Sequence, residues 1–255
     1  MDLIILGSGT AIPIIDRASP SYALFVKGER PMLMDMGPGT LRQLTKIGIS
    51  HERIGRIFLT HFHPDHCADM VHLLFATRNP RVLERRERLM ITGPTGLKKF
   101  LTALQSAFDP WLALPETLLH VEELDREDWG RRDYGRFKVS TAPTGHTANS
   151  LAYRLDAQNG KCVVFSGDTG FSQAVVDLAK GADLLILESA FPDSDPVEGH
   201  LTPAQAGRMA TWAGVKRLVL THFYPEALAA DIVSQCRTTY HGDLILAQDL
   251  LHLRI

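Results

Sequence analysis

The chain has 255 residues, of which 45% are hydrophobic and 22% charged, with a net charge of -2. We expect a single globular domain over residues 1–255. The small net charge gives no general attraction to nucleic acid, and three widely spaced cysteines exclude a disulfide framework or a cysteine-rich zinc module. No apolar run approaches the roughly 20 residues that span a membrane, and the amino terminus does not resemble a signal peptide. A cytoplasmic protein without a membrane partner is therefore expected.

Short runs rich in Ile, Val and Leu, bounded by Gly, Pro or Asp, predict strands along the chain. The predicted strands are residues 2–6, 22–26, 31–35, 56–60, 89–92, 137–142, 150–155, 162–166, 183–188, 217–221 and 243–247. Helical patterns lie between them, at about 40–48, 67–78, 95–107, 172–180, 203–213 and 225–237. Thr202 before Pro203 is typical of a helix start, and Gly181 and Gly214 are typical of helix ends. This alternation of elements predicts an α/β fold.

A short internal similarity indicates how these elements are arranged. Residues 57–64 (IFLTHFHP) resemble residues 218–225 (LVLTHFYP), and each segment comes after a predicted helix. The simplest explanation is two related halves, each packing one sheet face against the other, with helices outside. This predicts a four-layer αβ/βα sandwich in which histidine-containing loops of both halves meet at one edge, where ligand sites of α/β folds usually lie.

The segment 60–66, Thr-His-Phe-His-Pro-Asp-His, comes directly after a predicted strand and contains three imidazoles and a carboxylate. In a tight loop the side chains of His61 and His63 can converge on one point, while Asp65 and His66 point to a neighbouring one. Zinc and similar metals favour imidazole and carboxylate ligands. The chain has only 11 histidines, so this concentration indicates a metal site rather than an ordinary polar loop.

Three further residues stand just past predicted strands, beside glycine or threonine. They are His146, Asp168 and His222. Taken singly, a histidine or aspartate in such a glycine-rich turn is more often only a turn residue. Together they predict further ligands of the same metal site.

These motifs resemble the metallo-β-lactamase superfamily, whose metal-binding pattern is HxHxDH followed by His, Asp and His. Within it, the chain is most similar to ribonuclease Z-like phosphodiesterases. The resemblance lies in the segments 34–40, 166–169, 182–191, 199–202 and 220–223. It covers residues 1–70 and 140–225 and implies the four-layer metallo-β-lactamase fold.

The resemblance also implies two divalent metal ions, with Zn²⁺ expected and Mn²⁺ or Fe as alternatives. It assigns His61, His63 and His146 to one ion, Asp65, His66 and His222 to the second, and Asp168 as the bridge between them. The implied nucleophile is a metal-bound hydroxide, because water between two such ions ionises near neutral pH. Asp65 would orient this hydroxide or accept its proton. His200 would protonate the leaving group, oriented by Glu188; the alternative for His200 is a solvent-facing residue at a helix start.

Several other residues are open to a functional interpretation. Cys67 is more simply a small buried residue at a helix start than a thiolate ligand. Arg154 either pairs with a substrate phosphate or forms a salt bridge within its strand. Asp35 is expected to hydrogen-bond a ligand histidine rather than to bind metal itself.

The resemblance is poor over residues 72–136. The basic run at 78–99 is either a solvated face or a surface that attracts a phosphorylated substrate. The apolar residues Phe108, Trp111, Leu112 and Trp129 are expected to be core, with a lid or a self-association surface as alternatives. A homodimer is suggested only by the resemblance, because members of the family commonly form dimers.

The predicted substrate depends on the spacing between His146 and Asp168. Family members that process transfer RNA have a long arm inserted between the corresponding residues. Here the two residues are only 22 positions apart, which two strands and a turn nearly fill. We therefore expect a hydrolase of a small or cyclic phosphodiester rather than of RNA.

Three alternatives remain. The first is ribonuclease Z-type tRNA 3′-end processing, with residues 78–136 replacing the arm. The second is hydrolysis of lactones or thioesters at the same metal site. The third belongs to a different class, a di-iron redox protein.

Overall fold

The computed structural model describes residues 1–125 and 131–255, and the first of its two sheets is built mainly from the amino-terminal half. Its strands are β1 (Asp2–Gly7), β2 (Ser21–Phe25), β3 (Met32–Met34), β4 (Arg56–Phe58), β5 (Leu89–Pro94), β6 (Leu119–Leu124) and β14 (His252–Arg254). In the described residues this sheet has seven strands in the order β14-β1-β2-β3-β4-β5-β6. The pairs from β14 to β3 are antiparallel, and those from β3 to β6 are parallel.

The second sheet is built from the carboxy-terminal half. Its strands are β7 (Arg132–Asp133), β8 (Phe137–Pro143), β9 (Leu151–Ala157), β10 (Cys162–Phe165), β11 (Leu184–Glu188), β12 (Arg217–Thr221) and β13 (Asp243–Leu246). Over the described part of the chain the order is β13-β12-β11-β10-β9-β8-β7. The pairs from β7 to β10 are antiparallel and those from β10 to β13 are parallel.

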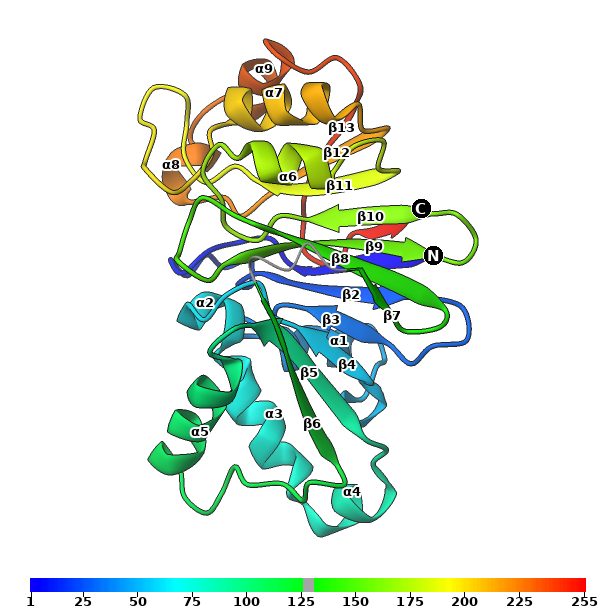
Figure 1. The fold of residues 1–255 in the computed structure, drawn as a ribbon. Helices are drawn as coiled ribbons and strands as arrows, with labels where there is room; N and C mark the ends of the chain where they lie inside the picture. Colours follow the sequence, from blue (N-terminus) through cyan, green and yellow to red (C-terminus); the bar gives the residue numbers. More distant parts are fainter. Residues whose placement is uncertain (126–130) are drawn as a thin grey trace.

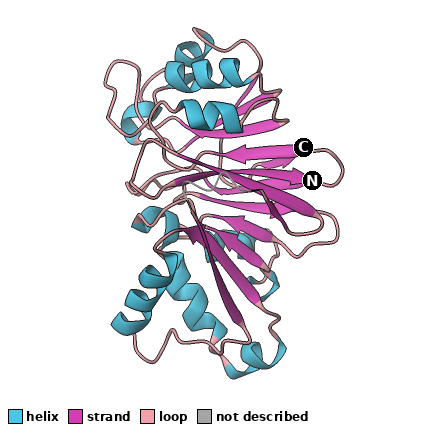
Figure 2. Ribbon diagram, viewed as in Figure 1, coloured by secondary structure: helices cyan, strands magenta, loops and turns pink. Residues whose placement is uncertain are grey.

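Helices cover the outer face of each sheet, so the molecule has the predicted four layers (Figures 1 and 2). On the side of the first sheet lie α1 (Thr40–Lys46), α2 (Pro64–Cys67), α3 (Asp69–Thr77), α4 (Pro80–Arg85), α5 (Leu97–Ala107) and the 3₁₀ helix η1 (His51–Arg53). On the side of the second lie α6 (Gln173–Leu178), α7 (Pro203–Ala213), α8 (Pro225–Leu228) and α9 (Ile232–Arg237). Among the helices of the described residues, none is both long and apolar enough to cross a membrane.

The main hydrophobic core fills the space between the two sheets. Alternate residues of each strand point to this layer, and aromatic rings from the two halves meet in it. Tyr22 of β2 packs on Phe165 of β10 with ring centroids 5.6 Å apart, and Phe58 of β4 packs on Tyr153 of β9 at 5.5 Å. The two sheets therefore form one packed unit that holds their loop ends in fixed positions.

The two sheets repeat the same pattern of strands, which confirms the prediction of two related halves. Counted from the antiparallel edge, β3 and β10 occupy equivalent positions, as do β4 and β11. The similar segments 57–64 and 218–225 begin within β4 and β12, which are not equivalent. The internal similarity therefore led to the correct architecture but does not mark matching strands.

Local signals explain several element boundaries. The hydroxyl of Thr202 accepts from the backbone N–H of Gln205, whose side chain bonds back to Thr202 in a capping box, and Gly214 ends α7 with φ 61°. The helix predicted at 225–237 is instead two short helices, α8 and α9. Strands β6, β7 and β14 lie outside the predicted set.

Candidate metal centre

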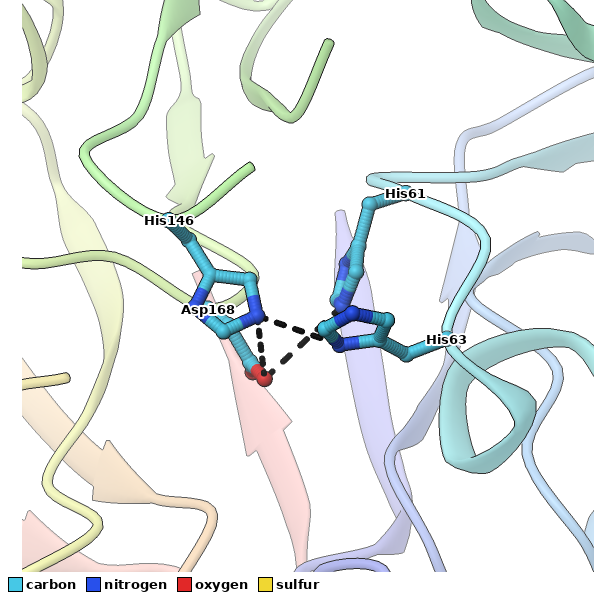
Figure 3. A group of neighbouring side chains, drawn as sticks. All are labelled: His61, His63, His146 and Asp168. Carbon is cyan, nitrogen blue, oxygen red and sulfur yellow. Dashed lines mark hydrogen bonds and ion pairs between the residues drawn. The ribbon is translucent and has the colours of Figure 1, made fainter. Parts of the chain in front are cut away.

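Loops from both sheets converge at one edge of the molecule and bring together a first group of four possible ligands. His61 and His63 follow β4 of the first sheet, while His146 follows β8 and Asp168 follows β10 of the second. Their side chains point toward one another (Figure 3). The Oδ2 atom of Asp168 lies 3.8 Å from His61 Nε2 and 3.6 Å from His146 Nε2. His146 Nε2 lies 3.1 Å from His63 Nδ1.

A second group lies beside the first and uses the other oxygen of Asp168. Asp65 and His66 belong to α2, and His222 follows β12. Asp168 Oδ1 is 3.1 Å from His66 Nε2 and 3.3 Å from His222 Nε2. Asp65 Oδ2 lies 3.6 Å and 3.5 Å from the same two nitrogens. Asp168 thus faces both groups, and the structure brings together all seven residues that the sequence analysis singled out as ligands.

Buried polar atoms without partners show that this cluster fits metal ions. The atoms in question are His61 Nε2, His66 Nε2, His222 Nε2 and Asp168 Oδ1, none of which has a hydrogen-bond partner among the described residues. Leaving such atoms buried and unpaired costs free energy. Imidazole nitrogens and carboxylate oxygens that face a common centre are suitable ligands for a divalent ion. These groups of side chains could hold metal ions.

The electrostatics of the cluster come from burial and from the close approach of imidazoles and carboxylates. Burial lowers the pKa of His61 well below its ordinary value, and the neighbouring His66 adds to this effect. Burial alone would raise the pKa of Asp168, but His222 and His66 outweigh it and hold that pKa well below its ordinary value. A neutral imidazole and an ionised carboxylate are the forms that bind a metal.

Asp35 supports the cluster from behind. Its Oδ2 lies 2.7 Å from His66 Nδ1 and accepts from the Thr60 hydroxyl at 2.8 Å, while its Oδ1 accepts from the Thr60 N–H at 2.8 Å. The Thr60 hydroxyl in turn lies 3.0 Å from His61 Nδ1. Asp35 therefore bonds His66 directly and reaches His61 through Thr60, so the hydrogen bond to a histidine of the cluster that was expected from the sequence is present.

Glu188 and His200 form a pair beside the second group. Glu188, at the end of β11, is 1% exposed, and its Oε1 lies 2.9 Å from His200 Nδ1. Its two oxygens also accept from the N–H groups of Thr169 and Leu201. Burial alone would lower the pKa of His200, but the hydrogen bond and charge of Glu188 outweigh it and raise that pKa. Since Nδ1 is engaged by Glu188, Nε2 is the nitrogen left for other partners.

Cys67 and Arg154, for which the sequence also allowed a functional role, have structural roles. Cys67 is buried at the end of α2, and burial raises the pKa of its thiol to about 12. Arg154 bonds Asp156 of its own strand at 3.1 Å and the carbonyl oxygens of Leu178 and Lys180, so it forms the salt bridge rather than facing the metal cluster.

None of the seven clustered residues belongs to the poorly matched region 72–136. In the basic run, Arg85 pairs with Glu52 and Arg86 is buried against backbone carbonyls. Leu112 is core as expected, but Phe108 and Trp111 are 47% and 57% exposed. The core interpretation is therefore wrong for these two aromatic residues, which line an apolar cavity of about 520 Å³. Trp129 lies outside the described residues.

Two aromatic residues near the cluster were missed by the sequence analysis. Phe191 follows Glu188 by three residues, and Tyr224 follows His222 by two. Their rings stack on each other with centroids 4.8 Å apart and planes 16° apart. The sequence could have indicated both residues, because each stands two or three positions after a residue of the predicted site.

The fold and the site define a metal-dependent hydrolase of the metallo-β-lactamase type. A family model described as "Beta-lactamase superfamily domain" matches residues 30–223. The chain belongs to this superfamily, and within it is close to ribonuclease Z.

Three similar proteins illustrate this relationship. Ribonuclease Z of Brevibacillus brevis is 30% identical, with 86% of this chain and 84% of that protein covered. The crystal structure of human tRNase Z, short form, has a TM-score of 0.80 at 27% identity and covers 100% of this chain and 99% of its own. The metallo-β-lactamase fold protein YhfI of Bacillus subtilis has a TM-score of 0.84 at 23% identity, with 99% of each chain covered.

Proposed function

We propose that the chain is a dinuclear metal-dependent phosphodiesterase whose substrate is a small or cyclic phosphodiester. One ion would be held by His61, His63 and His146 and the other by Asp65, His66 and His222, with Asp168 between them. Two divalent ions in these positions, with zinc expected, would activate a water molecule and polarise a phosphoryl oxygen. The convergence of these seven side chains supports the hydrolytic function.

The residues around the ions would carry the proton transfers of the reaction. Asp65 is buried and lies within 3.6 Å of two ligand nitrogens, so its carboxylate is placed to orient the attacking water and accept its proton. His200 would donate a proton from Nε2 to the leaving oxygen, since an alkoxide leaves poorly without one. Glu188, held by two backbone N–H groups, would keep His200 in the orientation and charge state that donation needs.

The short connection between β9 and β10 supports a small substrate. β9 ends at Ala157 and β10 begins at Cys162, so a tight turn stands where RNA-processing members of the family have a long arm. The alignment with Brevibacillus ribonuclease Z extends over 269 positions while covering 86% of this 255-residue chain, so that relative has residues with no counterpart here.

Cleavage of precursor tRNA at its 3′ end is the second candidate. It is favoured by the relatives, because ribonuclease Z and human tRNase Z are named for action on RNA, and this counts against a preference for small molecules. The two candidates share the phosphodiester bond and differ in the size of the substrate. The two candidates can therefore be distinguished by activity assays on a single sample whose metal content has been measured.

The test compares bis(p-nitrophenyl) phosphate and cyclic nucleotides with a precursor tRNA at physiological salt, and adds a lactone and a thioester. The proposal predicts metal-dependent turnover of the phosphodiesters and no site-specific cleavage of the tRNA. Efficient cleavage at the 3′ end would establish the second candidate. Turnover of the lactone or thioester alone would reject a phosphodiesterase, and two equivalents of iron without hydrolysis would favour redox chemistry.

A further inference from the structure

The orientation of His222 depends on its backbone rather than on a hydrogen bond to its ring. The ring of His66 is oriented by Asp35 through Nδ1, but the Nδ1 atom of His222 has no hydrogen-bond partner among the described residues. The backbone of His222 has φ 60°, in the left-handed region that residues other than glycine rarely adopt. Such a conformation persists only where the surrounding structure imposes it.

The chain is fixed on both sides of His222. Before it, β12 holds the chain as far as Thr221. After it, the Phe223 N–H donates to the Ser8 carbonyl at 3.4 Å. The Phe223 ring is fully buried, and the Arg17 guanidinium lies over it at 5.1 Å from the ring centroid. The groups that fix Ser8 and Arg17 therefore contribute to the direction in which the His222 ring points.

Arg17 connects the chain on both sides of His222. Its Nη1 atom donates to the Ser8 hydroxyl at 2.6 Å and to the Ala247 carbonyl at 2.8 Å. The Ala247 N–H in turn donates to the Leu220 carbonyl of β12 at 2.8 Å. One side chain thus joins the strand that precedes His222 to the loop that accepts the peptide after it.

Asp249 fixes Ser8 from the segment that joins the two sheets. This segment runs from β13 of the second sheet to β14 of the first. The Oδ1 atom of Asp249 accepts from the N–H and the hydroxyl of Ser8 at 2.9 and 2.8 Å. Its Oδ2 atom accepts from the Ala18 N–H at 2.7 Å and from Gln43 Nε2 at 2.6 Å. Hydrogen bonds to an ionised carboxylate are stronger than those between neutral groups, so Ser8 is firmly held.

We infer that Arg17 and Asp249 are positioning residues for His222 and set the metal affinity of the second group of ligands. They act through Ser8 and Phe223, and neither contacts the ion or the substrate. Without them the backbone of His222 can relax out of the left-handed region, and metal binding must then restore it at a cost in affinity. The inference rests on the metal cluster of the proposed function and adds two residues that lie outside its sequence motifs.

The test measures the affinities of both sites for Zn²⁺ by titrating the metal-free protein against a competing chelator. Arg17→Met removes the charge and both hydrogen bonds, and we expect about tenfold weaker binding at one site and a change within twofold at the other. Arg17→Lys should regain most of this affinity, because both bonds come from one nitrogen and an ammonium group can donate both. Arg154→Met is the matched control, since Arg154 likewise donates to two backbone carbonyls, and both its affinities should stay within twofold of the parent.

Two further variants identify the weakened site and the role of Asp249. His63→Ala removes a ligand of the first group, so the tighter site that remains belongs to the second group. Adding Arg17→Met to His63→Ala should weaken that remaining site about tenfold. Asp249→Asn should weaken the same site, because its amide NH₂ faces two of the four donors that the carboxylate accepts.

Unchanged affinities in Arg17→Met, an equal loss at both sites, or the same loss in Arg154→Met would overturn the inference. So would a failure of Arg17→Lys to regain affinity, or a remaining site in His63→Ala that Arg17→Met does not weaken. If Arg17→Met does not fold, Ser8→Ala decides, because it removes only the hydroxyl that Arg17 and Asp249 share and should weaken the same site. Uptake of fewer than two zinc ions by the unmodified protein would overturn the inference together with the proposed site. Two tightly bound ions without turnover of any phosphodiester would refute the proposed function alone.

Discussion

Replacing Asp35 by asparagine should weaken metal binding although Asp35 is not itself a proposed ligand. The carboxylate faces His66 Nδ1 and accepts two hydrogen bonds from Thr60. This arrangement keeps the proton of His66 on Nδ1 and leaves Nε2 free to bind a metal. In Asp35→Asn the amide NH₂ faces one of these donors, so the favoured His66 tautomer places the proton on Nε2, where it blocks the metal.

The size of this effect follows from the loss of one outer hydrogen bond to a metal ligand. Such changes reduce metal affinity about 10- to 100-fold, which is about 1.4–2.7 kcal/mol. Titration of the metal-free protein with Zn²⁺ against a competing chelator measures the change. One of the two sites is expected to weaken in this way, because His66 belongs to only one ligand group.

Asp183→Asn provides the matched control. Asp183 also accepts from a backbone N–H, that of Cys162 at 3.0 Å, and from Lys216 at 2.8 Å; among the described residues its side chain bonds to none of the ligand cluster. We expect its metal affinity to stay within twofold of the parent. Unchanged metal affinity in Asp35→Asn, or an equal loss in both variants, would refute the reasoning from the His66 tautomer.

Three further predictions concern the proton donor, the metals and the thiols. His200→Ala should keep both metals and slow substrates with poor leaving groups most; equal losses for good and poor leaving groups would reject its role as an acid. Removal of metal by a chelator should lower the melting temperature by about 5 °C or more per site at saturating metal, with recovery on adding zinc, and no shift would contradict a buried metal cluster. Burial raises the pKa values of Cys162 and Cys236 to about 11, so a thiol reagent at pH 8 should react slowly until urea unfolds the protein. Because these folded-state pKa values lie above those of the unfolded thiols, this contribution to stability is complete below about pH 8.5 and is lost as the pH rises toward 11.

Most of the clustered residues could be predicted because they stand within a few residues of the end of an apolar strand. A buried strand is visible in the sequence as a short run of Val, Ile and Leu, and its end places the next polar side chains at the edge of the sheet. His61 after β4, Asp168 after β10 and His222 after β12 follow this rule. The same reasoning predicted that Asp35 supports a ligand histidine.

The elements that were missed lack such a signal. β6 contains His120, Glu122 and Glu123 among its six residues, since it lies at the edge of its sheet, where solvent accommodates polar side chains. β7 has two residues and β14 has three, too few for any periodicity. The stacking of Phe191 on Tyr224 joins residues 33 positions apart, which only the packed loops bring together.

β3 and β10 occupy equivalent positions in the two sheets, and the loop after each strand contributes a residue at or near the site. Asp35 follows β3 directly and Asp168 follows β10 by three residues, so the loop after the equivalent strand supplies an aspartate in each half. Asp168 lies at 3.1–3.8 Å from histidine nitrogens of both groups, whereas among the described residues the Asp35 carboxylate bonds to His66 and Thr60. Asp168 therefore faces the cluster itself, whereas Asp35 hydrogen-bonds residues of the loop at 60–66 that contributes to it.

This arrangement couples metal binding to the packing of the two sheets. His61, His63, Asp65 and His66 come from the first sheet, and His146, Asp168 and His222 come from the second. Neither half alone provides all the side chains proposed to hold either ion. The free energy of metal binding would therefore be available only when the sheets are packed together, so substitutions in the core between the sheets should weaken metal binding even where they lie far from the proposed ligands.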